Sequence, residues 1–180
     1  MTTETTQIIS TGSSEINKKM GGGIPTGSLV LLEGQSDAGK SVLSQHFSHG
    51  ALSAKMSVAY YTTENTVKSL MSQMASLDLD VTDFFLCDRM RVYPLDTSSL
   101  EDDHSKLAFQ ILIDHLKQLP ERFQLAIVDS LTGLVAHSDD RSIIDFFAAC
   151  KQLCDEGRTV IPVVHSYAFE DRMLIRIRSL

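Results

Sequence analysis

The sequence of 180 residues has no tryptophan, only three cysteines and four prolines, and fewer basic than acidic residues. An odd number of cysteines does not indicate a disulfide framework. Cys150 and Cys154 are one helical turn apart on an apolar face, which favours core packing over a metal site. No apolar run approaches the ~20 residues of a membrane span, and residues 1–14 are polar and lack the apolar core of a signal peptide. These absences indicate a cytoplasmic protein.

Positive charge is also scarce. The formal net charge is −7 and the sequence pI is about 5.3, which argues against a broad electrostatic footprint for DNA or RNA, so no nucleic-acid partner is expected. A hydrophobic content of 43% is enough for a sizeable core. We therefore expect a single domain over residues 1–180.

Short apolar runs rich in Val, Ile, Leu and Tyr alternate with longer segments of helical period. This alternation predicts an α/β fold with a mainly parallel central sheet and helices on both faces. The predicted strands are Leu29–Glu33, Ser57–Thr62, Met90–Pro94, Leu125–Asp129 and Thr159–His165, and the predicted helices are Lys40–Ala54, Thr66–Leu77, Ser105–Leu119 and Ser142–Glu156. The acidic stretch Asp96–Asp103 is predicted to be a surface loop.

The most specific motif is Gly34-Gln35-Ser36-Asp37-Ala38-Gly39-Lys40-Ser41, which has the form G-x-x-x-x-G-K-[ST] and follows a predicted buried strand. Glycines at both ends let the backbone N–H groups turn inward around a phosphate, at the positive end of the following helix. Lys40 is then expected to reach the β- and γ-phosphates, and Ser41 to hold Mg²⁺. The cofactors predicted by this loop are ATP and Mg²⁺.

Two carboxylates are candidates for the rest of the site. Asp129 ends the apolar run Leu125–Val128, which is the usual form of a Walker B strand and predicts a second Mg²⁺ ligand; a turn-capping role is the alternative. Glu64 follows the strand Ser57–Thr62 and is the candidate general base, although the macrodipole of the next helix also favours an acid there.

His165 closes the fifth predicted strand at the same edge of the sheet, where it can read the γ-phosphate or simply end the strand. The candidate nucleotide-binding residues are Gly34, Gln35, Ser36, Asp37, Ala38, Gly39, Lys40, Ser41, Val42, Asp129 and His165, with Ser41 and Asp129 as candidate metal ligands. Together these residues predict a P-loop ATP-binding protein.

The segments Asn17–Ser28 and Ile127–Thr132 resemble the corresponding segments of RecA/KaiC-type ATPases. Three further segments are similar to the KaiC-like accessory ATP-binding proteins of the archaellum, the archaeal flagellum: 9–12, Tyr60–Ser69, and Ala168-Phe169 with Arg176–Ser179. The resemblance implies a RecA/KaiC-like P-loop NTPase core. Members of that family continue into further strands beyond the last of these segments, so the domain is expected to lack its C-terminal strands.

What this resemblance implies is an ATP-binding regulatory protein of the archaellum motor, with at most weak ATPase activity. The implied partners are the motor ATPase, the platform membrane protein and further copies of the chain in rings. The implied location is cytoplasmic, at the membrane-proximal base of the motor. A RecA-type DNA recombination or repair ATPase and another KaiC-like signalling ATPase remain alternatives. The residues after Asp129 and His165 are acidic where DNA contacts need Lys or Arg.

Overall fold

A five-stranded parallel sheet forms the centre of the computed structural model, which describes residues 7–96 and 102–180. The strand order is β3-β7-β6-β4-β5. Its members are β3 Leu32–Gly34, β4 Ser57–Thr62, β5 Met90–Pro94, β6 Phe123–Asp129 and β7 Thr159–His165. All four pairings between neighbouring strands are parallel, which confirms the predicted α/β class.

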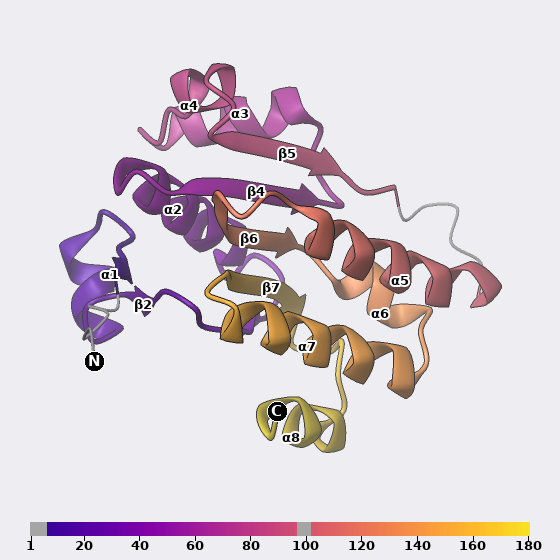
Figure 1. Cartoon of the computed structure of the whole chain (residues 1–180). Coiled ribbons are helices and arrows are strands. Elements are labelled where there is room, and N and C mark those ends of the chain that lie inside the picture. Colours follow the sequence, from indigo (N-terminus) through magenta and orange to yellow (C-terminus); the bar gives the residue numbers. More distant parts are fainter. Residues whose placement is uncertain (1–6, 97–101) are drawn as a thin grey trace.

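Helices cover both faces of the sheet (Figure 1). The helices α5 Asp102–Gln118, α6 Thr132–Ala136, α7 Asp140–Asp155 and α8 Asp171–Arg178 pack on one face, and α2 Lys40–Ser53 and α3 Val67–Ser76 pack on the other. Side chains of β4 alternate between the two cores, with Val58 and Tyr60 toward α2, and Ala59 and Tyr61 toward α5. Because side chains on a strand alternate between the two faces, the consecutive residues Tyr60 and Tyr61 lie in different cores.

The strand before the phosphate loop differs from its prediction. The sequence predicted a buried strand over Leu29–Glu33, whereas β3 spans Leu32–Gly34 and is half-buried, with Leu29 making an isolated parallel bridge to Val160. The reason is its position at the edge of the sheet, where it has a strand neighbour on only one side. Edge strands are generally short for this reason.

The four predicted helices are present, with ends that move by at most three residues. Asp139 caps α7 by accepting a hydrogen bond from the backbone N–H of Ser142, and Gly157 follows the helix with φ 100°. Most of the surface loop predicted at Asp96–Asp103 lies outside the described residues, and α5 already begins at Asp102.

Several elements were not predicted: the pair β1 Ile8–Ile9 and β2 Ile24–Pro25, and the helices α1 Ser14–Lys19, α4 Thr82–Leu86, α6 and α8. The N-terminal pair docks against α2 at Gly50, where a Cβ atom would lie 1.6 Å from the carbonyl oxygen of Ser10. Only glycine permits that approach. Among the described residues, every helix is too short or too polar to cross a bilayer.

Candidate functional site

The glycine-rich loop connects β3 to α2 at the carboxyl end of the sheet. Gly39 is the N-cap of α2 and has φ 80°, a left-handed conformation that suits glycine. Asp37 has φ 59° and its side chain is exposed to solvent. The loop therefore leads directly into a helix N-terminus, whose free N–H groups make a site for an anion.

Lys40 is the first residue of α2, directly after the loop, and only 8% of its surface is exposed. Its Nζ donates to the carbonyl oxygen of Gln35 at 2.6 Å and lies 3.4 Å from Nδ1 of His165. The hydroxyl oxygen of Ser36 lies 3.3 Å from the same Nδ1. His165 at the end of β7 thus contacts the loop that follows β3.

Asp129 ends β6 beside the first turn of α2, with 5% of its surface exposed. Ser41 donates its hydroxyl to Oδ1 at 3.2 Å, and Tyr60 donates its hydroxyl to Oδ2 at 2.6 Å. Burial, followed by the negative charge of Asp129, raises the pKa of Tyr60 well above its usual range, so the phenol stays protonated. A carboxylate and a hydroxyl are oxygen ligands of the type that Mg²⁺ prefers, so these residues fit the ion.

Glu64 is exposed and follows the carboxyl end of β4. Its strand is tied to β6 because the backbone N–H of Thr63 donates to the carbonyl oxygen of Asp129 at 3.0 Å. A crevice of about 480 Å³ separates Glu64 from the loop. Its lining residues are Ser36, Asp37, Ala38, Gly39, Lys40, Ser41, Val42, Glu64, Gln73, Asp129, Ser130 and His165.

The structure therefore brings together most of the candidate residues from the sequence. Gly34 and Gln35 do not line the crevice; the carbonyl oxygen of Gly34 accepts from the backbone of Ser166, and that of Gln35 accepts from Lys40. Four residues that lie in or directly behind the crevice were not predicted from the sequence: Ser44, Tyr60, Gln73 and Ser130. Ser44 had a usable signal, since it lies one helical turn after Ser41.

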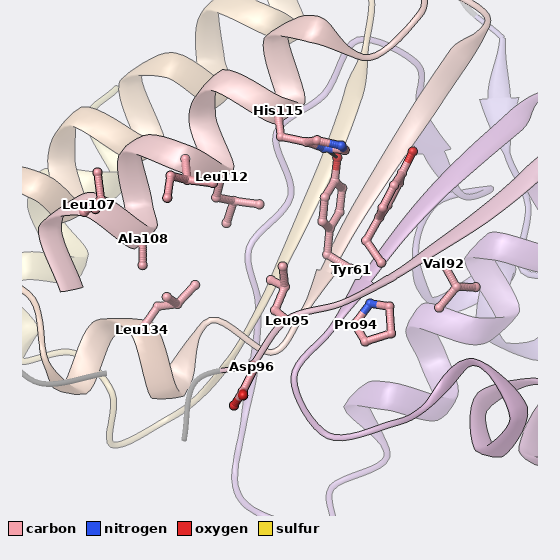
Figure 2. Close-up of a pocket in the computed structure, with 12 residues that line it drawn as sticks. Tyr61, Val92, Pro94, Leu95, Asp96, Leu107, Ala108, Leu112, His115 and Leu134 are labelled. Carbon is pink, nitrogen blue, oxygen red and sulfur yellow. Dashed lines mark hydrogen bonds between the residues drawn. The ribbon is translucent and has the colours of Figure 1, made fainter. Parts of the chain in front are cut away.

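A second hollow of similar volume, about 490 Å³, lies beside α5 and contains none of the candidate residues (Figure 2). The hydroxyl oxygen of Tyr61 lies 2.7 Å from Nδ1 of His115, and the Tyr61 ring stacks on Tyr93, with 4.9 Å between ring centroids. Burial, and then the nearby charge of Arg91, lowers the pKa of His115. Aliphatic side chains, including Leu112 and Leu134, form most of the remaining wall.

Comparison with known proteins agrees with this geometry. The model of the KaiC ATPase family matches residues 9–169. An archaeal flagellar ATP-binding protein FlaH from Sulfolobus acidocaldarius is 29% identical over 176 residues, which cover 96% of this chain and 75% of the relative. The protein of the same name from Methanocaldococcus jannaschii is 30% identical over 169 residues, covering 92% of this chain and 70% of the relative.

The same likeness holds in three dimensions. The crystal structure of the flagellar accessory protein FlaH from Methanocaldococcus jannaschii superimposes with a TM-score of 0.76 at 25% identity, covering 96% of this chain and 77% of that one. Sequence and fold thus agree over nearly the whole described chain. The chain belongs to the KaiC family of ATPases and, within it, to the archaeal flagellar ATP-binding proteins of the FlaH type.

Proposed function

We propose that this protein binds ATP with Mg²⁺ in the crevice and regulates the archaellum motor through nucleotide-dependent association with the motor ATPase. The observation that carries this proposal is the convergence of Lys40, Ser41 and Asp129, which come from two distant parts of the chain, around one polar crevice. The relatives are archaeal flagellar ATP-binding proteins by name, which supports the same assignment.

In the proposed complex, the N–H groups of the loop and of the first turn of α2 surround the phosphates, and Lys40 leaves the carbonyl oxygen of Gln35 to contact them. Ser41 and Asp129 would hold the Mg²⁺ ion, Asp129 through water. The ion supplies neutralisation of phosphate charge when it is bound. Each group already lies at the edge of the crevice.

We propose that hydrolysis is slow or absent, with Glu64 as the base that orients the attacking water. Two observations support slow turnover. Glu64 is exposed, so bulk water surrounds the proposed base. Lys40 is the only lysine or arginine among the described residues that line the crevice, whereas fast phosphoryl transfer generally uses an additional arginine.

Regulation requires that ATP and ADP favour different association states, because a ligand with equal affinity for both shifts nothing. His165 is the proposed relay, since Nδ1 lies beside Ser36 and Lys40 while the ring stacks on Tyr167, which is 71% exposed. A change near the γ-phosphate can thus reach the segment 166–171 at the surface. We propose the base of the motor as the place of action, with rings and the platform membrane protein as further contacts.

Sedimentation of the protein with the motor ATPase, in ATP and in ADP, tests this function. We expect association to differ between the nucleotides, and His165→Ala to abolish the difference while His49→Ala, a change on α2 outside the crevice, retains it. Identical association in ATP and in ADP would contradict the proposed nucleotide-dependent regulation. Salt-dependent retardation of single-stranded DNA would favour a repair-type ATPase instead.

A further inference from the structure

A buried network of hydrogen bonds lies behind the carboxylate of Asp129. Tyr60 and Ser44 are both fully buried. The Tyr60 hydroxyl lies 2.6 Å from Oδ2 of Asp129 and 2.8 Å from Oγ of Ser44, and Oγ of Ser44 lies 3.2 Å from Oδ2. Three polar groups therefore meet in a place that solvent does not reach.

The directions of these hydrogen bonds follow from their chemistry. An ionised carboxylate only accepts, so Tyr60 donates its single proton to Asp129. The phenol oxygen can then accept from Ser44, whose other acceptors within reach are the carbonyl oxygen of Ser41 at 2.9 Å and Oδ2 of Asp129. The shortest bond to the carboxylate therefore comes from Tyr60.

The two oxygens of Asp129 have different partners. Oδ2 points to Tyr60 and Ser44 on the buried side, whereas Oδ1 points to Ser41, the other proposed Mg²⁺ ligand. The terminal torsion of an aspartate is soft, so without an anchor the carboxylate can rotate. A short, charge-assisted bond to one oxygen restricts that rotation.

We propose that Tyr60 is a positioning residue, which fixes the Asp129 carboxylate so that Oδ1 faces the Mg²⁺ that accompanies ATP. This inference rests on the proposed function, because it assumes that Asp129 serves the metal. Changes in groups that orient metal-binding residues generally lower metal affinity by 10- to 100-fold. Tyr60 therefore affects the metal-dependent part of nucleotide affinity, although it does not line the crevice itself.

The chain provides a matched control in the next residue. Tyr61 is equally buried, but it lies in the core on the other face of the sheet, where its hydroxyl hydrogen-bonds with Nδ1 of His115 (Figure 2). Tyr60→Phe and Tyr61→Phe each remove one oxygen from the same strand and break one side-chain hydrogen bond. A merely structural role predicts similar effects of both changes.

The experiment measures ATP affinity by calorimetry with MgCl₂ and with EDTA. For Tyr60→Phe we expect the ATP affinity in EDTA to stay within about twofold of the wild type. We expect the increase in ATP affinity that Mg²⁺ provides to fall by about tenfold. Tyr61→Phe should keep the full gain. Ser44→Ala, which removes the partner of the phenol, should show a smaller loss of about two- to fivefold and serves as a second variant if Tyr60→Phe folds poorly.

A second measurement tests whether Tyr60 acts through Asp129. In an Asp129→Asn background, Tyr60→Phe should cause no further loss of the Mg²⁺-dependent gain, because residues that act as a unit are not additive. Additive losses would overturn the inference, as would a full Mg²⁺ gain in Tyr60→Phe when the wild type shows that gain. A wild-type protein that binds ATP equally with and without Mg²⁺ would overturn the proposed function itself.

Discussion

The crevice at the loop and the hollow beside α5 have almost the same volume, about 480 and 490 Å³, yet their chemistry is opposite. The crevice gathers a lysine, three carboxylates and a histidine, while aromatic and aliphatic side chains dominate the hollow. Adjacent residues of β4 serve the two regions, since Tyr60 bonds to Asp129 behind the crevice and Tyr61 bonds to His115 in the hollow. Size alone therefore does not identify a nucleotide site; convergent polar groups do.

The largest effect should follow from removing the cation of the crevice. We expect Lys40→Ala to lower ATP affinity by about a hundredfold or more, because no other lysine or arginine lines the crevice in the described part of the chain. Calorimetry with ATP and Mg²⁺ measures this. Lys117→Ala, an exposed change on α5, is the control. Unchanged affinity in Lys40→Ala would assign nucleotide binding to another part of the molecule.

Glu64→Gln should separate binding from turnover within the crevice. The amide keeps the shape of the carboxylate but cannot accept a proton, so we expect ATP affinity to stay within about twofold and hydrolysis to fall by about a hundredfold. Phosphate release, measured on the wild type and on Glu121→Gln as a surface control, provides the comparison. Loss of affinity together with turnover would show that Glu64 is structural.

In the hollow, the expected effect is on stability. Leu112 is 3% exposed, and Leu112→Ala should lower the free energy of unfolding by about 2–4 kcal/mol, because it removes buried methyl groups and leaves a larger cavity. Leu107→Ala, on the same helix but 56% exposed, should cost less than about 1 kcal/mol. Urea denaturation checks both, and the ATP affinity of each folded variant should not change. A parallel loss of affinity would mean that the two regions are coupled.

Alkaline pH should lower the free energy of unfolding through both regions, and this is the smallest of the expected effects. Burial is the main cause that raises the pKa of both Tyr60 and Tyr61, so these phenols stay neutral in the folded state at a pH where the unfolded chain ionises. Their contribution to stability is fully present below about pH 10 and is lost as pH rises further, by at most about 1.4 kcal/mol per pH unit for each phenol. Urea denaturation between pH 8 and 11 measures the slope, and Tyr60→Phe and Tyr61→Phe should each reduce it. A free energy of unfolding that stays constant over this pH range would contradict the expected contribution of the two phenols.

Much of the fold was predictable because hydrophobic periodicity is a local property. The predicted bounds of β4, β5 and β7 match the structure, since each strand is a compact run of β-favouring residues between turn signals. The shortened, half-buried β3 was not predictable in the same way. A position at the edge of the sheet depends on strand order, which no short stretch of sequence contains.

The candidate site, like the fold, was predictable only in part. The loop and Asp129 stand out because their motifs combine a few residue types at fixed spacing. Tyr60 carries no such signal, and its role depends on the parallel pairing that sets Thr62 opposite Asp129. Ser44 is indicated only by its position one helical turn after Ser41. The helix α8 was missed for another reason. It has only eight residues, including three arginines, and its buried positions Met173, Leu174 and Ile177 make a short pattern.

The pairing of β3 with β7 has a consequence for how the molecule folds. Ser36 and His165 meet across 129 positions of sequence, and the parallel pairing between Gly34 and His165 joins an early strand to a late one. Closing so long a segment carries an entropic cost, and long-range parallel pairing is slow. During synthesis, the crevice therefore cannot form until β7 has left the ribosome. Because ATP binds only the folded form, we expect it to slow amide hydrogen exchange most clearly along β3 and β7.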